Sequence, residues 1–209
     1  MSSKMGRREF IGAAAVSALA LPAMLKGLET SSEAADAKKS GMRVIAVEEH
    51  VGTPQLSAAL KAAGINARES SPTLAAKLND LGAKRLADMD AAGIEMQVLS
   101  VAGVGLEKLD RNTGIAVARD INDMLANAVK SHPDRFAAFA VLPLQAPDAA
   151  AAELERCVTK VGFKGALISG TINGHFLDNP VFQPVFAAAE QLDVPIYLHP
   201  APPPKSVMD

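Results

Sequence analysis

The chain has 209 residues, of which 49 % are apolar and 4 % aromatic, and its formal net charge is −2. This length is sufficient for one sizeable hydrophobic core, and the composition is that of an ordinary soluble globular protein. The near-neutral charge gives no electrostatic footprint for nucleic acid, and the single cysteine, Cys157, excludes a disulfide framework within the chain.

The first 37 residues differ from the rest of the chain and resemble a twin-arginine export signal. The pair Arg7-Arg8 precedes Phe10 and an alanine-rich apolar run at 11–25, and a pattern of small residues ends at Ala37. The alternative, an N-terminal membrane anchor, needs a longer and more apolar segment. We therefore expect this segment to direct the protein to the periplasm and to be removed, leaving no permanent membrane anchor.

From position 42 onward, short apolar segments alternate with helical patterns. The apolar segments are bounded by glycine, proline or charged residues, which is typical of strands covered on both faces. Five strands are predicted, at 44–48, 96–101, 136–141, 165–169 and 195–199. The alternation predicts an α/β fold with a parallel sheet and right-handed crossovers.

Three helices are predicted from apolar residues at helical spacing. They contain Ile115, Ala118, Ile121, Leu125 and Val129; then Leu154, Cys157, Val158 and Val161; then Phe182, Val185, Phe186 and Ala189. The second is expected to begin at Pro147-Asp148, because proline and aspartate both favour the first turn of a helix. Its spacing makes Cys157 a core residue rather than a nucleophile.

Residues of metal-ligand type close the first and the last predicted strands. Because side chains alternate along a strand, Glu48 and His50 point to one side and Glu49 to the other. His199 closes the last strand. Each strand end taken alone is equally consistent with a solvated terminus, but together the two ends predict half of a metal site, with Glu48, His50 and His199 as candidate ligands. One carboxylate and two imidazoles suit Zn²⁺ or Mn²⁺.

Sites at the carboxyl ends of strands occur in barrels and in open doubly wound sheets. The first strand is followed by Val51-Gly52-Thr53-Pro54-Gln55, which contains no glycine-rich phosphate loop. We therefore expect an α/β fold of the (β/α)8 TIM-barrel type, with the doubly wound sheet as the alternative.

Several segments between position 43 and the end of the chain resemble the amidohydrolase-related decarboxylases, in the same order and at similar spacing. That family includes gamma-resorcylate, 5-carboxyvanillate and aminocarboxymuconate-semialdehyde decarboxylases. The matching segments are Glu48-Glu49-His50, Asp90-Ala91-Ala92-Gly93-Ile94, Ala118-Arg119-Asp120-Ile121-Asn122-Asp123, His132-Pro133-Asp134-Arg135-Phe136, Leu142-Pro143-Leu144-Gln145, Gly162-Phe163-Lys164-Gly165-Ala166 and Leu198-His199-Pro200.

The resemblance implies a (β/α)8 barrel with one divalent ion, commonly zinc or manganese, held by Glu48, His50, His199 and an aspartate from the last strand. It implies non-oxidative decarboxylation of a small hydroxylated aromatic or related carboxylic acid, without an organic cofactor, and association of complete chains into homo-oligomers. The expected aspartate and a catalytic histidine would lie beyond Asp209, so no catalytic residue is assigned within this chain.

Two residues are candidates for binding the substrate. Ser169 stands where relatives often carry asparagine, and its hydroxyl can donate a hydrogen bond. His175 lies in the loop after the fourth predicted strand, at the face where barrel enzymes build their sites. The neighbouring Gly174 also favours a surface turn there, which is the alternative for His175.

Removal of 37 of the 209 residues leaves 172 and five predicted strands, whereas such barrels typically need about 250 residues. We therefore expect residues 38–209 to be the N-terminal part of a barrel domain, truncated after about the fifth strand, with weak metal affinity and no activity when isolated. Five apolar residues would then need cover from other strands or another chain: Ile45, Val98, Phe139, Leu167 and Ile196. Two alternatives to the decarboxylase stay open, a metal-dependent hydrolase of a lactone or amide on the same barrel and an inactive truncated product.

Overall fold

The computed structural model describes residues 41–66, 71–101 and 105–201. The predicted export signal at 1–37 lies outside these residues. Within the described ranges, no helix combines the length and the apolar character that a membrane span requires.

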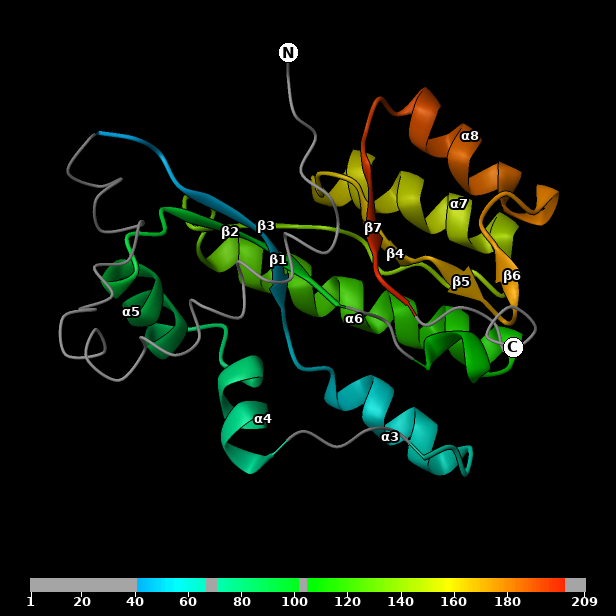
Figure 1. Ribbon diagram of the computed structural model, residues 1–209, viewed down its shortest axis with the longest axis horizontal. Coiled ribbons are helices and arrows are strands. Elements are labelled where there is room, and N and C mark those ends of the chain that lie inside the picture. Colours follow the sequence, from blue (N-terminus) through cyan, green and yellow to red (C-terminus); the bar gives the residue numbers. More distant parts are fainter. Residues whose placement is uncertain (1–40, 67–70, 102–104, 202–209) are drawn as a thin grey trace, which may run out of the picture.

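Five parallel strands form at the predicted places and build an open, twisted array (Figure 1). They are β1 (Ile45–His50), β2 (Met96–Ser100), β3 (Phe136–Ala138), β4 (Ala166–Ser169) and β7 (Ile196–His199). β2 pairs with β1 on one side and with β3 on the other, and β4 pairs with β7. A parallel bridge between Ala140 and Ala166 joins the two sheets. Among the described residues, β1 and β7 do not pair with each other, so the strands do not close into a barrel.

The six α-helices of the described residues include the three that the sequence predicts and three more between β1 and β2. They are α3 (Pro54–Ala62), α4 (Pro72–Asn79), α5 (Ala83–Ala91), α6 (Arg111–Ser131), α7 (Pro147–Arg156) and α8 (Gln183–Gln191). The last three match the three helical patterns, and α7 begins at Pro147 as predicted. The Asp110 carboxylate begins α6 by accepting hydrogen bonds from the backbone of Asn112 and Thr113.

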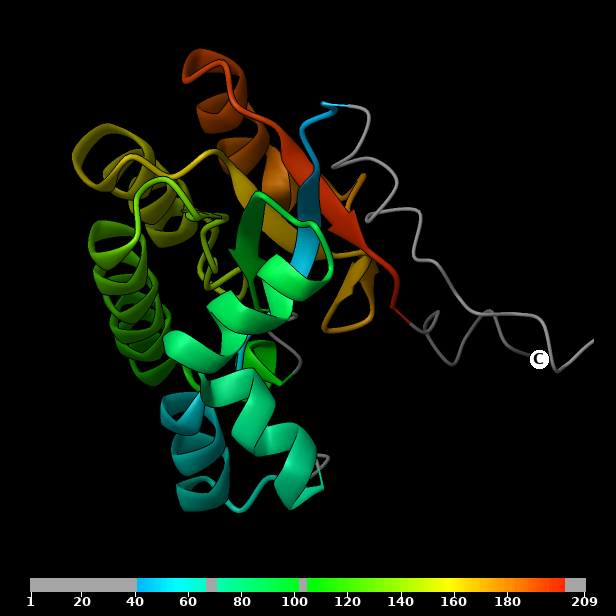
Figure 2. The same ribbon diagram turned by 90° about the vertical axis from the view of Figure 1, so that its left-hand side faces the viewer.

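The main core lies between the strands and the helices α6, α7 and α8, which flank the array on one side (Figure 2). Leu99 of β2, Ile121 and Leu125 of α6, and Leu154 of α7 are fully buried there. Cys157 is also fully buried, in a π-helical turn at Cys157–Val161 that follows α7, and burial raises the pKa of its thiol. The interpretation of Cys157 as a core residue is confirmed.

A second, smaller cluster lies on the opposite side of the strands. It consists of Val98, Ala137, Phe139 and Leu167, with Tyr197 packed against them. The rings of Phe139 and Tyr197 stack with centroids 5.8 Å apart and planes 24° apart. The expectation that Val98, Phe139 and Leu167 lack cover is therefore wrong, because these side chains bury one another.

The two edge strands depart from the prediction that both faces are covered. Ile45 and Val47 of β1 are 44 % and 45 % exposed, and Leu198 of β7 is 57 % exposed, because neither strand has a described neighbour on its outer side.

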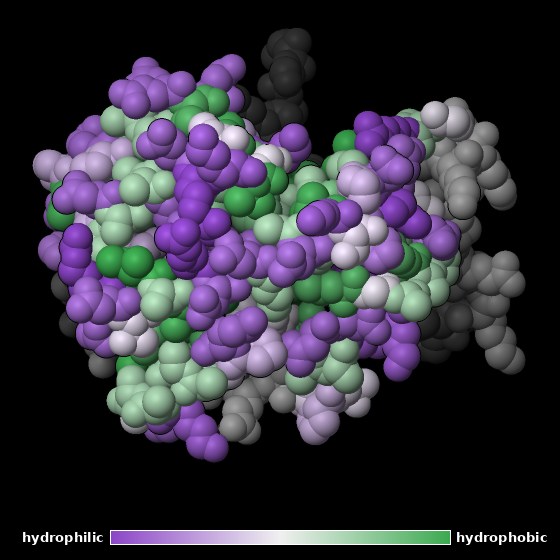
Figure 3. Space-filling model, turned by 180° about the vertical axis from the view of Figure 1, so that it is seen from behind, coloured by the Kyte–Doolittle hydropathy of each residue, from purple (hydrophilic) through white to green (hydrophobic). Residues whose placement is uncertain are grey.

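Viewed from behind, the surface mixes hydrophobic and hydrophilic residues over short distances (Figure 3). Single hydrophobic side chains on the surface are common in folded proteins.

A small antiparallel hairpin follows β4. Its strands are β5 (Thr171–Ile172) and β6 (His175–Phe176), and the two residues between them, Asn173 and Gly174, have φ of 49° and 81°. Positive φ at both central residues is the requirement of a tight two-residue hairpin, which asparagine followed by glycine satisfies best. The surface turn considered for His175 is therefore present.

Candidate metal centre

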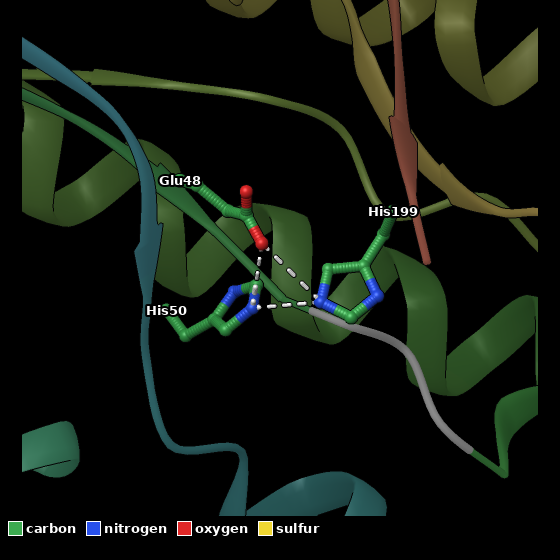
Figure 4. Close-up of side chains that lie close together, drawn as sticks. All are labelled: Glu48, His50 and His199. Carbon is green, nitrogen blue, oxygen red and sulfur yellow. Dashed lines mark hydrogen bonds and ion pairs between the residues drawn. The ribbon is translucent and has the colours of Figure 1, made fainter. Parts of the chain in front are cut away.

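The structure brings the side chains of Glu48, His50 and His199 together (Figure 4). His50 Nε2 lies 3.2 Å from His199 Nε2. Glu48 Oε1 lies 3.8 Å from His50 Nε2 and 3.4 Å from His199 Nε2. The three predicted ligands therefore form one cluster, although Glu48 and His50 come from β1 and His199 comes from β7.

The strands place this cluster at their carboxyl ends. β1 contains an irregularity between Ala46 and Glu49, where it has one residue more than the paired segment of β2. Beyond it the pairing resumes, with His50 opposite Ser100, and the backbone N–H of Val51 donates to the Ser100 carbonyl at 3.0 Å. Such bulges commonly redirect side chains beside functional sites.

The spacing of the three donor atoms fits a single small cation. The point equidistant from atoms separated by 3.2, 3.4 and 3.8 Å lies about 2 Å from each, which is the length of a zinc bond to nitrogen or oxygen. A carboxylate oxygen with two imidazole nitrogens is a donor set that zinc and manganese both accept. The residues present therefore fit a divalent ion.

Hydrogen bonds at the far side of each imidazole hold the rings in place. His199 Nδ1 lies 2.8 Å from the carbonyl oxygen of Pro200. A carbonyl only accepts, so Nδ1 carries the proton and the Nε2 lone pair faces the cluster. His50 Nδ1 lies 3.1 Å from the buried Ser100 hydroxyl, which can accept its proton in the same way. Partners of this kind orient metal-binding histidines in proteins.

Partial burial and the adjacent His199 favour the neutral form of His50. Its partial burial lowers the pKa of this imidazole, and the adjacent His199 lowers it further, against the opposing charges of Glu48 and Glu49. A neutral imidazole has a lone pair available for a metal, so the site disfavours the protonation that would compete with binding.

Tyr197 binds the second oxygen of the Glu48 carboxylate. Its hydroxyl donates to Glu48 Oε2 at 2.6 Å, a short distance typical of a hydrogen bond to an ionised acceptor. This hydrogen bond raises the pKa of the Tyr197 hydroxyl, because a phenolate beside a carboxylate is unfavourable. Tyr197 therefore remains the proton donor of the pair at neutral pH.

Arg85 of α5 fixes the backbone at the end of β1. Its guanidinium donates to the carbonyl oxygen of His50 at 3.0 Å, to the side-chain oxygen of Gln97 at 3.1 Å and to the carbonyl oxygen of Asp80 at 2.9 Å. The Arg85 side chain thus connects α5 to Gln97 of β2 and to His50, whose Nε2 is one of the two nitrogens of the cluster.

The two candidate substrate residues lie in different surroundings. Ser169 is opposite His199 in the β4–β7 pairing, at the same end of the strands as the cluster. His175 is exposed in β6, and its Nδ1 lies 3.2 Å from the side-chain nitrogen of Asn179. The structure therefore places Ser169 beside a member of the cluster and His175 in the surface hairpin.

A cavity of about 940 Å³ adjoins the cluster. Glu48, Glu49 and His50 of β1 line it, together with Lys77 of α4 and Arg85 of α5. This volume lies within the usual range for small-molecule sites, and the wall carries charges of both signs.

Sequence reasoning did not identify three residues that contact the cluster: Ser100, Tyr197 and Arg85. Tyr197 precedes His199 by two positions on one strand, so alternation alone could have placed both on the same side. Ser100 ends the strand that follows β1 in the chain. Arg85 left no such signal, because its hydrogen bonds reach mostly backbone carbonyl groups.

Comparison with known proteins gives a consistent result. The amidohydrolase family model matches residues 49–207. The gamma-resorcylate decarboxylase of Rhodococcus jostii (strain RHA1) is 42 % identical over 169 residues, covering 76 % of this chain and 51 % of that enzyme. The chain thus spans about half the length of the curated relatives it matches.

Solved structures agree with the sequence relatives. One solved structure is the 5-carboxyvanillate decarboxylase of Novosphingobium aromaticivorans, a D314N variant with bound manganese and a hydroxylated nitrobenzoic acid. It aligns with a TM-score of 0.74 at 33 % sequence identity, and the alignment covers 82 % of this chain and 54 % of that enzyme. Another is a dihydroxybenzoic acid decarboxylase from Polaromonas sp. JS666 with bound manganese and the inhibitor 2-nitroresorcinol. It aligns with a TM-score of 0.67 at 37 % sequence identity, and the alignment covers 78 % of this chain and 51 % of that enzyme. The chain therefore belongs to the amidohydrolase family, and its relatives include metal-dependent decarboxylases of aromatic acids.

Proposed function

We propose that this chain supplies three metal ligands of a non-oxidative decarboxylase that acts on a hydroxylated aromatic or related carboxylic acid. The observation that carries the proposal is the convergence of Glu48, His50 and His199 on one point, with donor atoms 3.2–3.8 Å apart. Relatives with bound manganese and aromatic acids or their analogues support this reading, with zinc as the alternative ion.

In the proposed reaction, a proton replaces the carboxylate on the ring. The carbon that bears the carboxylate takes up a proton, the bond to the carboxyl group breaks, and its electron pair returns to the ring as carbon dioxide leaves. No oxidant or organic cofactor is needed. A bound divalent ion would supply positive charge that orients the substrate carboxylate with its adjacent hydroxyl and stabilises negative charge.

The residues of this chain would serve mainly to hold and orient. Glu48, His50 and His199 would bind the ion and leave positions for a substrate, as open catalytic metal sites do. Ser169, beside His199 in the strand pairing, would donate a hydrogen bond to the substrate. We also propose a role in substrate binding for His175, which requires the hairpin at β5 and β6 to turn toward the site.

Carbon dioxide release tests the proposal. The substrates are gamma-resorcylate and 5-carboxyvanillate, and the proteins are the Mn²⁺-loaded chain alone and its fusion to the half of the Rhodococcus jostii enzyme that the chain does not match. We expect the fusion to release carbon dioxide from at least one substrate, and the same fusion with Glu48→Gln to lose this activity.

The outcome separates the alternatives. A folded, metal-loaded fusion that releases no carbon dioxide from either acid, but hydrolyses a lactone or amide, would replace the decarboxylase with the hydrolase. Comparable release by the Glu48→Gln fusion would remove the proposed metal site from the reaction.

A further inference from the structure

The glutamate of the metal cluster presents its two oxygens to different partners. Glu48 Oε1 faces the two histidine nitrogens at 3.4 and 3.8 Å. Glu48 Oε2 accepts the hydrogen bond of Tyr197 at 2.6 Å. One oxygen of the carboxylate therefore faces the histidines of the cluster, and the other accepts the hydrogen bond of the tyrosine.

Tyr197 is well placed to hold this arrangement. Its ring stacks on Phe139 and packs against the small cluster of Val98, Ala137 and Leu167. It stands two residues before His199, so one strand carries both the tyrosine and a histidine of the site. The hydrogen bond joins positions 149 residues apart and connects β7 to β1, two strands that do not pair.

We propose that Tyr197 is a positioning residue that occupies Glu48 Oε2 and thereby keeps Glu48 a one-oxygen ligand with Oε1 turned to the ion. This inference rests on the metal site of the proposed function. Without the hydroxyl, the carboxylate is free to rotate about its terminal bond, which is a soft torsion, and the orientation of Oε1 is lost. Loss of such an outer partner typically reduces metal affinity about 10–100-fold.

The chain offers an internal probe for this contact. Tyr197 is the only tyrosine in the chain, and there is no tryptophan. Tyrosine emission therefore reports on this one hydroxyl and its surroundings. We expect Mn²⁺ to quench this emission saturably, with a midpoint equal to the dissociation constant obtained by paramagnetic resonance of free Mn²⁺.

Two variants separate positioning from packing. Tyr197→Phe keeps the stacked ring and removes the hydroxyl, and we expect its Mn²⁺ dissociation constant to rise about 10–100-fold at little cost in thermal stability. Phe139→Leu perturbs the stack and leaves the hydroxyl, and we expect it to lower stability while changing the dissociation constant much less. Dissociation constants for all variants come from paramagnetic resonance, which does not depend on the tyrosine.

A double-mutant cycle with Glu48→Gln completes the test. If Tyr197 acts through Glu48, Tyr197→Phe has no further effect on affinity in the Glu48→Gln background. Equal Mn²⁺ affinity in the wild type and in folded Tyr197→Phe would overturn the positioning role and leave the metal site intact. A full additional loss in the double variant would also overturn it, and a wild type that binds no Mn²⁺ would remove both the site and this inference.

Discussion

His50 and His199 are 149 positions apart in the chain, and their Nε2 atoms lie 3.2 Å apart. Each imidazole has a partner at its other nitrogen, Ser100 for His50 and the Pro200 carbonyl for His199. The two lone pairs thus converge beside a carboxylate, an arrangement that a shared cation would stabilise.

The backbone anchor at Arg85 predicts a coupling between stability and metal binding. Arg85→Met removes hydrogen bonds to His50, Gln97 and Asp80, and we expect it to lower the free energy of unfolding by roughly 2–3 kcal/mol. Because one of these bonds fixes the backbone of His50, the Mn²⁺ dissociation constant should rise about tenfold. Urea denaturation and metal titration measure the two effects.

The matched control is Arg135→Met. Arg135 also donates to backbone carbonyls, those of Glu95 and Ile94, and it pairs with Asp90. It precedes β3, at the opposite end of the strands from the cluster. It should lower stability but leave metal affinity unchanged, and equal loss of affinity in both variants would mean that Arg85 acts only through global stability.

Substitution of Asn122, which lies away from the metal cluster, is expected to lower the stability of the fold strongly. This fully buried amide of α6 pairs with both the N–H and the carbonyl of Val141 at 2.9 Å, and it also donates to Glu153 at 2.8 Å. Asn122→Ala removes the partner of the buried N–H and carbonyl of Val141, and we expect a loss of about 2–4 kcal/mol in the free energy of unfolding. Asn127→Ala, at an exposed position of the same helix, should stay within about 0.5 kcal/mol of the wild type.

Glu153 predicts part of the loss of stability in acid. Burial alone would raise the pKa of this carboxyl, but the hydrogen bonds from Arg156 and Asn122 outweigh it, so the pKa is lower in the folded protein than in the unfolded chain. The unfolded chain then binds the proton more readily, and the stabilisation is present above the unfolded pKa of about 4.3 and is lost as pH falls through the folded value.

Urea denaturation of the wild type and Glu153→Gln across this range measures the contribution. The difference in unfolding free energy between the two proteins should be constant near neutral pH and shrink below the unfolded pKa. A difference that does not change down to strong acid would mean that Glu153 keeps the same pKa in both states.

We propose export by the twin-arginine route, from residues 1–37. Replacement of Arg7 and Arg8 by lysine should hold the protein in the cytoplasm with the N-terminal segment attached, because the consecutive arginines are the feature that this route reads. Fractionation and mass analysis of the N-terminus measure this. A normally processed form outside the inner membrane would contradict the proposal.

The strands and the cluster were predictable because they depend on local patterns. Apolar runs marked the five parallel strands, and the two-residue alternation placed Glu48 and His50 on one side of β1. The helices α3, α4 and α5 were not predicted, and α4 has no buried residue and therefore no apolar stripe. The hairpin strands β5 and β6 have two residues each, too few to show alternation.

The contacts around the cluster were harder to predict from the sequence. The hydrogen bond from Tyr197 to Glu48 spans 149 positions, and that from Arg85 to His50 ends on a backbone carbonyl. Alternation along β7 places Tyr197 on the same side as His199, but no pattern in the sequence identifies Glu48 or the His50 carbonyl as the hydrogen-bond partners. The exposure of Ile45 and the burial of Phe139 likewise depend on which strands become neighbours, a property of the assembled sheet.

The central claim is that Glu48, His50 and His199 together hold one divalent ion. Spin-echo modulation of bound Mn²⁺ detects coordinated imidazole nitrogen directly, alongside metal content by elemental analysis. In the fusion to the second half of the Rhodococcus jostii enzyme, we expect about one ion per chain with two nitrogen ligands. His50→Ala or His199→Ala in this fusion should remove one nitrogen ligand and most of the metal, whereas Glu49→Ala should have little effect. Bound Mn²⁺ without nitrogen coupling, or equal metal content in the wild type and both histidine variants, would contradict the account.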